Sequence, residues 1–177
     1  MKLSLVTTPN PILNQKTQAV KQFDQRLLSI INEMKKILNS CTDPEGVGLA
    51  APQAGLNLSL FLMKPYSKSK ISVFINPQII ELAKENSHRQ DALEGCLSIK
   101  NTWATVKRAK WVVLKYQNET GNFFTKKFTG WEAQIIQHEM DHLQGVLFTN
   151  RALEQEQKLF RIEKNKQGEE RLVPIEL

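Results

Sequence analysis

The segment Gln137–Leu143 carries two histidines and a glutamate at a spacing suited to metal-assisted hydrolysis. It reads QHEMDHL, so that an H-E-x-x-H pattern runs from His138 to His142. On a helix, residues four apart project from the same face, and both imidazoles can therefore bind one metal ion. Glu139 lies next along the helix, where its carboxylate can take a proton from an activated water. The chain has three histidines and two of them are in this motif, which favours a metal site over a merely solvated helix face.

A catalytic metal site of this kind needs a third protein ligand and one open position. No histidine follows His142, so a third imidazole would have to come from His88. Acidic residues and Cys96 are the alternatives. Cys96 stands beside Gly95, whose missing side chain permits a close approach of the backbone. A lone cysteine is more often a small buried apolar residue than a ligand, so the residues alone leave the third ligand open.

The segment Gly46–Gln53 combines small residues with an amide at its end. It reads GVGLAAPQ, and its two glycines and two alanines allow a ligand or another chain to come near the backbone. Gln53 can donate hydrogen bonds to such a ligand. The segment lacks the spacing of a dinucleotide-binding loop, and no P-loop lysine follows it.

Apolar residues that recur at helical spacing predict three helices to carry these groups. Their expected ranges are 22–40, 130–144 and 151–166. Thr129 and Glu132 predict a capping box at the start of the second helix, and Gly145 predicts its end. Asn150 is the expected cap of the third helix, and 43–46 is expected to be a loop.

Short runs rich in β-branched and aromatic residues predict strands between and after these helices. The expected strands are 58–63, 71–75, 78–82, 111–116, 123–128 and 171–175. The strands at 111–116 and 123–128 flank Asn118-Glu119-Thr120-Gly121 and predict a hairpin. Hairpins rather than βαβ units predict an α+β fold with antiparallel sheet.

Length and composition predict one soluble, cytoplasmic domain covering residues 1–177. A chain of 177 residues with 41% hydrophobic content can bury a sizeable core. Two cysteines, Cys41 and Cys96, do not form a disulfide scaffold and indicate free thiols in a reducing compartment, or metal-binding or catalytic groups. The apolar run Leu3–Val6 is too short for a signal peptide, and no stretch has the length of a membrane-spanning helix.

The net charge of +6 is concentrated in residues 100–127, which hold seven basic residues and one acid. Attraction to RNA is one interpretation. A solvated sheet face is the better one, because the basic residues form no unbroken run and accompany no nucleic-acid-binding motif.

Taken together and in this order, three segments resemble the peptide deformylase family. The family carries G-x-G-x-A-A-x-Q, then E-G-C-L-S, then Q-H-E-x-D-H, and the matching segments here are 46–53, 94–98 and 137–142. The resemblance covers most of the chain. It implies a metal-dependent hydrolase that removes the formyl group from the N-terminal formyl-methionine of new polypeptides. The implied fold is α+β, with antiparallel β-sheets packed around a central metal-binding helix and with N-terminal and C-terminal helices.

The resemblance also implies a role for each matched residue. The implied metal ligands are Cys96, His138 and His142, and the metal is typically Fe²⁺, replaceable by Zn²⁺, Ni²⁺ or Co²⁺. Glu139 would act first as the general base and then as the general acid. Gln53 and the backbone N–H of Leu97 would stabilise the oxyanion, and Gly48 would pair with the substrate backbone as a strand does.

The methionine side chain of such a substrate requires an apolar pocket. Val47 and Ile135 are candidates for its lining, because Ile135 stands three residues before His138 on nearly the same helix face. Trp131 is a further candidate, for which ordinary core packing is an equally good interpretation. Arg108 is expected to pair with Asp141, since a buried charge on the metal-bearing helix needs a partner.

Three residues depart from the family pattern near the motifs. Lys100 stands where many members have proline, Trp103 where many have arginine, and Gln134 where an apolar residue often lines the pocket. These departures favour an altered cleft and keep open an unusual N-acyl substrate. Two further alternatives are a zinc endopeptidase, which needs neither Cys96 nor Gln53, and a metal-stabilised binding protein, which needs no Glu139.

The C-terminal region bears on a possible partner. In bacterial members of the family a basic C-terminal helix contacts the ribosome. Residues 151–177 here hold six basic and six acidic residues, although 158–166 is basic. The expected partners are N-formyl-methionyl peptides and nascent chains, with a ribosome contact and no membrane.

Overall fold

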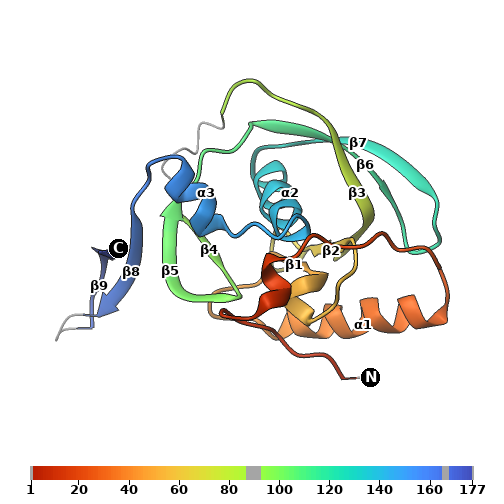
Figure 1. Ribbon diagram of the computed structural model, residues 1–177, viewed down its shortest axis with the longest axis horizontal. Helices are drawn as coiled ribbons and strands as arrows, with labels where there is room; N and C mark the ends of the chain where they lie inside the picture. The colour runs from red at the N-terminus through yellow and green to blue at the C-terminus, as the bar shows by residue number, and fades with distance from the viewer. Residues whose placement is uncertain (1, 87–92, 165–167, 177) are drawn as a thin grey trace.

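The computed structural model describes residues 2–86, 93–164 and 168–176 (Figure 1). Its helices are η1 (Pro11–Asn14), α1 (Gln25–Ser40), η2 (Ala51–Ala54), α2 (Gly130–Leu143) and α3 (Phe148–Glu154). Its strands are β1 (Gly48–Ala50), β2 (Leu60–Met63), β3 (Ser72–Leu82), β4 (Leu93–Cys96), β5 (Ile99–Thr105), β6 (Trp111–Gln117), β7 (Phe123–Thr129), β8 (Leu159–Lys164) and β9 (Glu170–Pro174).

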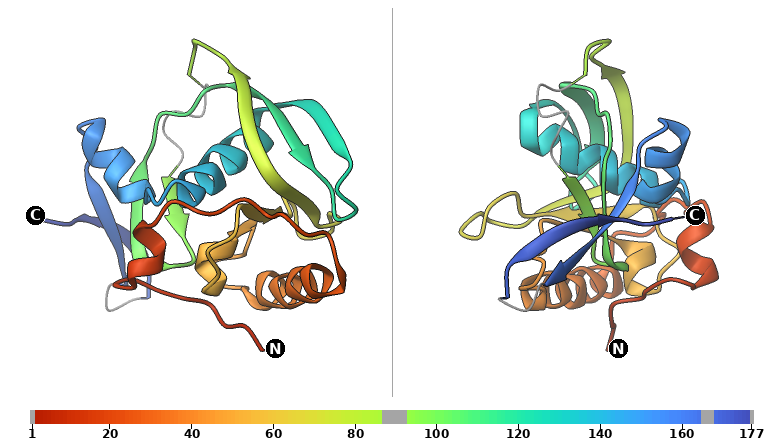
Figure 2. Two further views of the ribbon diagram at one scale, coloured as in Figure 1. Left: turned by 45° about the vertical axis from the view of Figure 1, so that its right-hand side comes forward. Right: turned by 90° about the vertical axis from the view of Figure 1, so that its left-hand side faces the viewer.

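The strands form two antiparallel sheets, which confirms the predicted α+β class. One sheet has the order β1-β2-β3-β6-β7, and the other has the order β4-β5-β8-β9. Figures 1 and 2 show α2 in the middle of the molecule, between the two sheets, with α1 beyond β1 and β2. The helix that carries the H-E-x-x-H pattern is therefore central.

Strand β2 is buried on both faces because a helix packs against each side of the five-stranded sheet. Its residues Leu60 and Leu62 point into a cluster with α1, and Phe61 and Met63 point into a cluster with α2. All four are 2% exposed or less. This explains why its sequence, Leu-Phe-Leu-Met, is apolar throughout rather than alternating. Helix α1 begins three residues later than predicted, where the Asp24 side chain accepts a hydrogen bond from the Leu27 N–H at 3.0 Å.

Helix α2 begins at a glycine, and a second glycine follows its C-terminal end. Gly130 has a φ of 55° and turns the end of β7 into the helix, and Gly145 has a φ of 73° just beyond the other end, as predicted. The predicted capping box is wrong. Thr129 is the N-cap residue, but its side chain makes no capping hydrogen bond, because the left-handed backbone at Gly130 replaces the usual entry into a helix.

The hairpin of β6 and β7 is confirmed, with Gly121 at a φ of 84° in its turn. The two strands predicted at 71–75 and 78–82 are instead one strand, β3, whose register shifts between Ile75 and Gln78. Asn76 and Pro77 cause this irregularity. Asn76 has a φ of 48° and hydrogen bonds through its side chain to the backbone of Val20, so that the strand bends without ending.

The third helix was predicted in the wrong place. It covers Phe148–Glu154, and the chain then forms β8, which pairs with β5 through Trp103↔Phe160 and Ala104↔Leu159. Pairing with an existing sheet edge overrides the helical tendency of the charged residues here. The predicted final strand is confirmed as β9, which pairs with β8.

The basic residues of the β6–β7 hairpin lie on the surface. Lys115, Lys126 and Lys127 are exposed, and each ammonium group lies over an aromatic ring at 3.9–5.4 Å from the ring centre. Among the described residues, no helix is long and apolar enough to cross a membrane.

Candidate metal centre and substrate cleft

Two secondary-structure elements bring a thiol and two imidazoles together. Cys96 is the last residue of β4, and His138 and His142 are one turn apart on α2. One ligand atom from each of these residues lies within 4.8 Å of the others. The Cys96 Sγ is 3.2 Å from the His142 Nε2. The three residues predicted as metal ligands therefore converge on one point, while the alternative ligand His88 lies outside the described residues.

The orientation of His138 suits a metal ligand. Its Nδ1 lies 3.2 Å from the Glu94 Oε2, which leaves Nε2 as the nitrogen able to bind a metal. Such a carboxylate partner is the usual support of a ligating histidine. A thiolate and two imidazoles are a donor set for Fe²⁺, Zn²⁺, Ni²⁺ or Co²⁺, and three protein ligands leave a position open. The residues present thus fit a divalent transition metal.

The electrostatics of the cluster favour the ionised form of its thiol. Burial alone would raise the pKa of Cys96, but the adjacent His142 and His138 hold that pKa well below its ordinary value. A thiolate is the form of cysteine that binds metals. Cys96 and His142 are buried, at 6% and 1% exposed, so this charge is stabilised inside the protein rather than by solvent.

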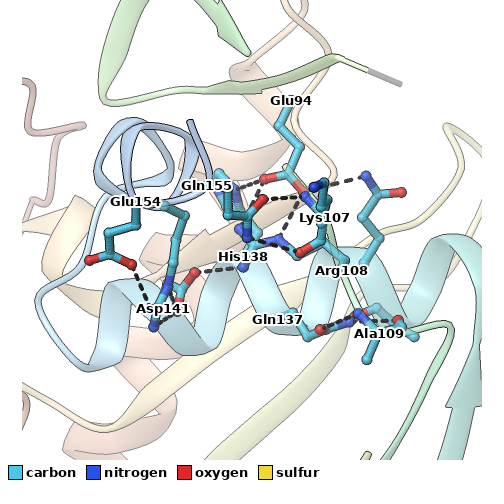
Figure 3. Close-up of polar contacts among 12 residues, drawn as sticks. Glu94, Lys107, Arg108, Ala109, Gln137, His138, Asp141, Glu154 and Gln155 are labelled. Carbon is cyan, nitrogen blue, oxygen red and sulfur yellow. Dashed lines mark hydrogen bonds and ion pairs between the residues drawn. The ribbon is translucent and has the colours of Figure 1, made fainter. Parts of the chain in front are cut away.

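Behind His138, a chain of buried ion pairs runs to the surface (Figure 3). Glu94 accepts hydrogen bonds from the Arg108 Nε and Nη2, both at 2.9 Å. The Arg108 Nη1 donates to Asp141 at 2.6 Å, which confirms the predicted pair, and Asp141 also accepts from Arg151 at 2.9 and 3.1 Å. Burial acts to raise the pKa of Glu94, but hydrogen bonds from His138 and Arg108 hold that pKa at about 2. Glu94 is therefore an anion that links a metal ligand to Arg108.

Glu139 lies in the same centre and contacts the glycine-rich segment. Its carboxylate is buried, and burial raises its pKa to about 7. A side-chain carbon at Gly48 would lie 2.1 Å from the Glu139 Oε1. Glycine at position 48 is thus required for the carboxylate to occupy this place, a role that the sequence did not reveal. A group with a pKa near neutrality can both accept and release a proton.

The Gln53 amide points its NH₂ group toward the metal centre. Its Oε1 accepts a hydrogen bond from the Ala50 N–H at 2.9 Å, and its Nε2 donates to the Ser98 Oγ at 3.2 Å and toward the Cys96 Sγ at 3.4 Å. Leu97 follows Cys96 in the turn between β4 and β5 and lines the cleft beside it. Both residues predicted as oxyanion donors are therefore adjacent to the cluster.

A cavity of about 200 Å³ opens in front of these groups. The four residues predicted to bind substrate all line it: Val47, Gly48, Trp131 and Ile135. Trp131 is held in place because its indole N–H donates to the Pro65 carbonyl oxygen at 3.0 Å. The walls are mainly apolar, and Gln53, His138 and Glu139 supply polar groups on the side of the metal centre.

Other residues of the cleft were missed or only suspected from sequence. Trp103 and Gln134, the departures from the family pattern, both line this cavity, as do Leu93 and Gly95. The position of Gln134 could be inferred from its place one turn before His138. Trp103 and Gly95 lie in the cleft because β5 folds back on β4, which no local pattern predicted. Glu94 was missed as the partner of His138.

The fold and the site together define a class of protein. A buried thiolate and two imidazoles, with a carboxylate beside them and an apolar cleft in front, are typical of the active site of a metal-dependent hydrolase.

Comparisons with known proteins identify the family within this class. The family model of polypeptide deformylase matches residues 2–158. A peptide deformylase of Borreliella burgdorferi is 40% identical over 146 residues, which are 82% of this chain and 85% of that protein. The crystal structure of peptide deformylase from Thermotoga maritima superposes with a TM-score of 0.77 at 33% identity, covering 85% of this chain and 97% of that one. The chain belongs to the peptide deformylase family.

Proposed function

We propose that this protein is a peptide deformylase, a hydrolase that removes the formyl group from the N-terminal formyl-methionine of newly made polypeptides and releases formate. The observation that carries this conclusion is the convergence of Cys96, His138 and His142 within 4.8 Å beside Glu139. Membership of the family supports the choice of the formyl amide as the bond that is cleaved.

Cys96, His138 and His142 would hold the metal, and Glu94 would fix the orientation of His138. A bound divalent metal would polarise the formyl oxygen and lower the pKa of water in the open position. We infer Fe²⁺ as the resident metal, with Zn²⁺, Ni²⁺ or Co²⁺ as substitutes. The resemblance of the motifs implies this order, and a mixed sulfur and nitrogen donor set accepts all four ions.

Glu139 would move the proton. Its carboxylate takes a proton from the water that attacks the formyl carbon and passes it to the departing amine, so that formate and a free N-terminus result. A pKa of about 7, raised by burial, suits both steps. Gly48 leaves the space in which this carboxylate sits.

Gln53 and Leu97 would stabilise the negative charge that develops on the formyl oxygen. The Gln53 Oε1 is held by the Ala50 N–H, which fixes the amide with its donor end toward the centre. A donor already in place is worth a few kcal/mol in the transition state, because it needs no rearrangement during the reaction. We assign the second donor to the backbone N–H of Leu97.

The substrate would bind along β1 and into the apolar cavity. Strand β1 pairs with β2 on one side and is at the edge of its sheet, so Gly48 can pair with an extended peptide on the other side. The methionine side chain would enter the cavity between Val47, Trp131 and Ile135.

The substrate that is cleaved and the product that is released distinguish deformylation from endopeptidase activity and from the removal of another acyl group. Metal-loaded protein should convert a formyl-methionyl peptide into the same peptide with a free amine, leaving every internal peptide bond intact by mass spectrometry. Cleavage at an internal bond would indicate an endopeptidase. Turnover of an acetyl-methionyl peptide in place of the formyl peptide would indicate an altered acyl specificity.

We also infer a cytoplasmic location and a contact with the ribosome, where formylated chains emerge. The net charge of +6 supports attraction to ribosomal RNA. The C-terminal hairpin adds little, because Arg161 and Arg171 pair with Glu163. Co-sedimentation with ribosomes should weaken steeply as salt is raised, whereas salt-insensitive co-sedimentation, or none, would contradict an electrostatic contact.

A further inference from the structure

A second cavity continues the substrate cleft past the metal centre. It has a volume of about 440 Å³, larger than the first. The two cavities share five lining residues: Pro44, Gly95, Cys96, Leu97 and Trp103. A peptide whose first residue occupies the first cavity can therefore extend into the second one, past Pro44 and Trp103, which line both.

Trp103 forms one wall of this junction. Its half-buried indole lies directly on Gly95, where a side-chain carbon would be 2.7–3.0 Å from three atoms of the ring. The ring thus occupies the space that a side chain at position 95 would need. The backbone of Trp103 is positioned by strand pairing, because β5 pairs with β8 at Trp103↔Phe160. The indole lines both cavities at their junction.

Two carboxylates also line the joined cavities. Asp43 lines the second cavity and Glu45 lines the first, so they flank Pro44 at the junction. Both are exposed, and neither makes an ion pair with a residue in the described part of the chain. Lys100 lines only the second cavity and is the one lysine or arginine among the described residues of either lining.

We propose that Trp103, which lines the two joined cavities together with Asp43 and Glu45, makes this enzyme favour substrates with lysine or arginine in the first two residues after formyl-methionine. An aromatic face attracts a cation, and nearby carboxylates add to this attraction. An indole alone would accept any apolar side chain, whereas the two unpaired acids outnumber Lys100 in the combined lining and favour a cationic one. The inference rests on the proposed function, since it concerns residues of the same substrate.

The test compares peptides that differ in one charge. Two peptides carry lysine, formyl-Met-Lys-Ser at the second position and formyl-Met-Ala-Lys at the third. Each is compared with a peptide in which norleucine replaces that lysine. For wild type, kcat/KM at low salt should favour lysine about fivefold in at least one position, mainly through KM, and the preference should shrink in high salt. Equal or better turnover of both norleucine peptides would overturn the proposal.

Variants assign the preference to these residues. Asp43→Asn combined with Glu45→Gln should bring the ratio close to one, and Trp103→Leu should lower it while leaving an apolar wall. The matched control is Glu81→Gln combined with Glu156→Gln, two exposed acids outside both linings, which should keep the wild-type ratio. An unchanged ratio in the cleft variants, or an equal loss in the control, contradicts the proposal. Turnover of norleucine peptides shows deformylation independently, whereas no turnover of any peptide by metal-loaded protein would overturn the function itself.

Discussion

The Glu94 carboxylate accepts four hydrogen bonds: two from Arg108, one from Gln134 and one from His138. It thereby connects the candidate metal centre to the buried ion pairs of Arg108. It has two effects, because it contacts His138, a proposed metal ligand, and balances the charge of the buried Arg108. The pKa of Arg108 is raised, since Glu94 and Asp141 outweigh the opposing effect of burial. Removing the carboxylate charge should therefore affect both metal binding and stability.

Glu94→Gln should weaken metal binding by roughly 10–100-fold, because His138 loses its carboxylate support. It should also lower the free energy of unfolding of the metal-free protein by about 3 kcal/mol, since Arg108 keeps a single buried anion. Chelator competition and urea denaturation measure the two effects. Glu154→Gln, at the exposed end of the same network, is the control and should change stability by less than about 1 kcal/mol. Equal effects of the two substitutions would contradict this account.

Gly48→Ala should lower kcat by roughly 100-fold or more with little change in metal content. The added carbon would lie 2.1 Å from the Glu139 Oε1, so the carboxylate must move, and a small misplacement of a catalytic group costs about this much. Steady-state kinetics and metal analysis of the purified variant check the prediction. Near-wild-type kcat would show that Glu139 does not act from its observed position.

The residues of the site were largely predictable where one element or motif carries them. His138, Glu139 and His142 share a helix turn, so their spacing alone predicted convergence. Cys96 could be chosen over His88 only through the resemblance, because the residues alone left the third ligand open. The role of Glu94 was not predicted, since it depends on tertiary contacts between β4 and α2, in which Glu94 meets Gln134 and His138.

At the scale of elements, α2 is bounded by two glycines: Gly130 is its first residue, and Gly145 follows its C-terminal end. Gly130 and Gly145 both have positive φ, but their surroundings differ. A side-chain carbon at Gly130 would meet nothing within 4 Å, whereas one at Gly145 would lie 2.6 Å from the backbone of Asn14. The C-terminal end of α2, which follows His142, is thus packed against the N-terminal segment.

Gly145→Ala should destabilise the protein by at least about 1 kcal/mol more than Gly130→Ala. Both substitutions carry the backbone strain of a left-handed residue, about 1–3 kcal/mol, so their difference isolates the contact with Asn14. Urea midpoints of the two metal-free variants provide the comparison. Equal losses would indicate that the N-terminal segment moves away at little cost.

Secondary structure was predicted best for helices with one apolar face and worst for segments whose structure depends on pairing with a distant strand. The spacing of apolar residues located α1 and α2, and the turn at Gly121 located the β6–β7 hairpin. The helix expected at 151–166 failed because Leu159 and Phe160 pair with β5, an edge that the sequence does not reveal. The prediction of two strands separated between residues 75 and 78 was wrong, because the side chain of Asn76 supports a bend within one continuous strand.

For the whole molecule, we propose that residues 1–177 unfold as one domain. Three apolar clusters lie around α1, around α2 and between α3 and the four-stranded sheet. The ion pairs of Arg108 with Glu94 and Asp141 link β4 to α2, which packs against the five-stranded sheet. Metal-free protein should therefore show a single urea transition. The urea midpoint followed by far-ultraviolet circular dichroism should equal the midpoint followed by tryptophan fluorescence, because Trp103, Trp111 and Trp131 lie on different elements. Two separated transitions would contradict a single unit.

Formate release from formyl-Met-Ala-Ser by anaerobically purified, Fe²⁺-loaded protein tests the central claim most directly, with Glu139→Ala as the matched variant. The account predicts formate from the wild type and a loss of roughly 100- to 10,000-fold in the variant, the range for removal of a general base, at equal metal content. No formate from fully metal-loaded wild type would contradict deformylation. Equal release by the variant would contradict the role of Glu139.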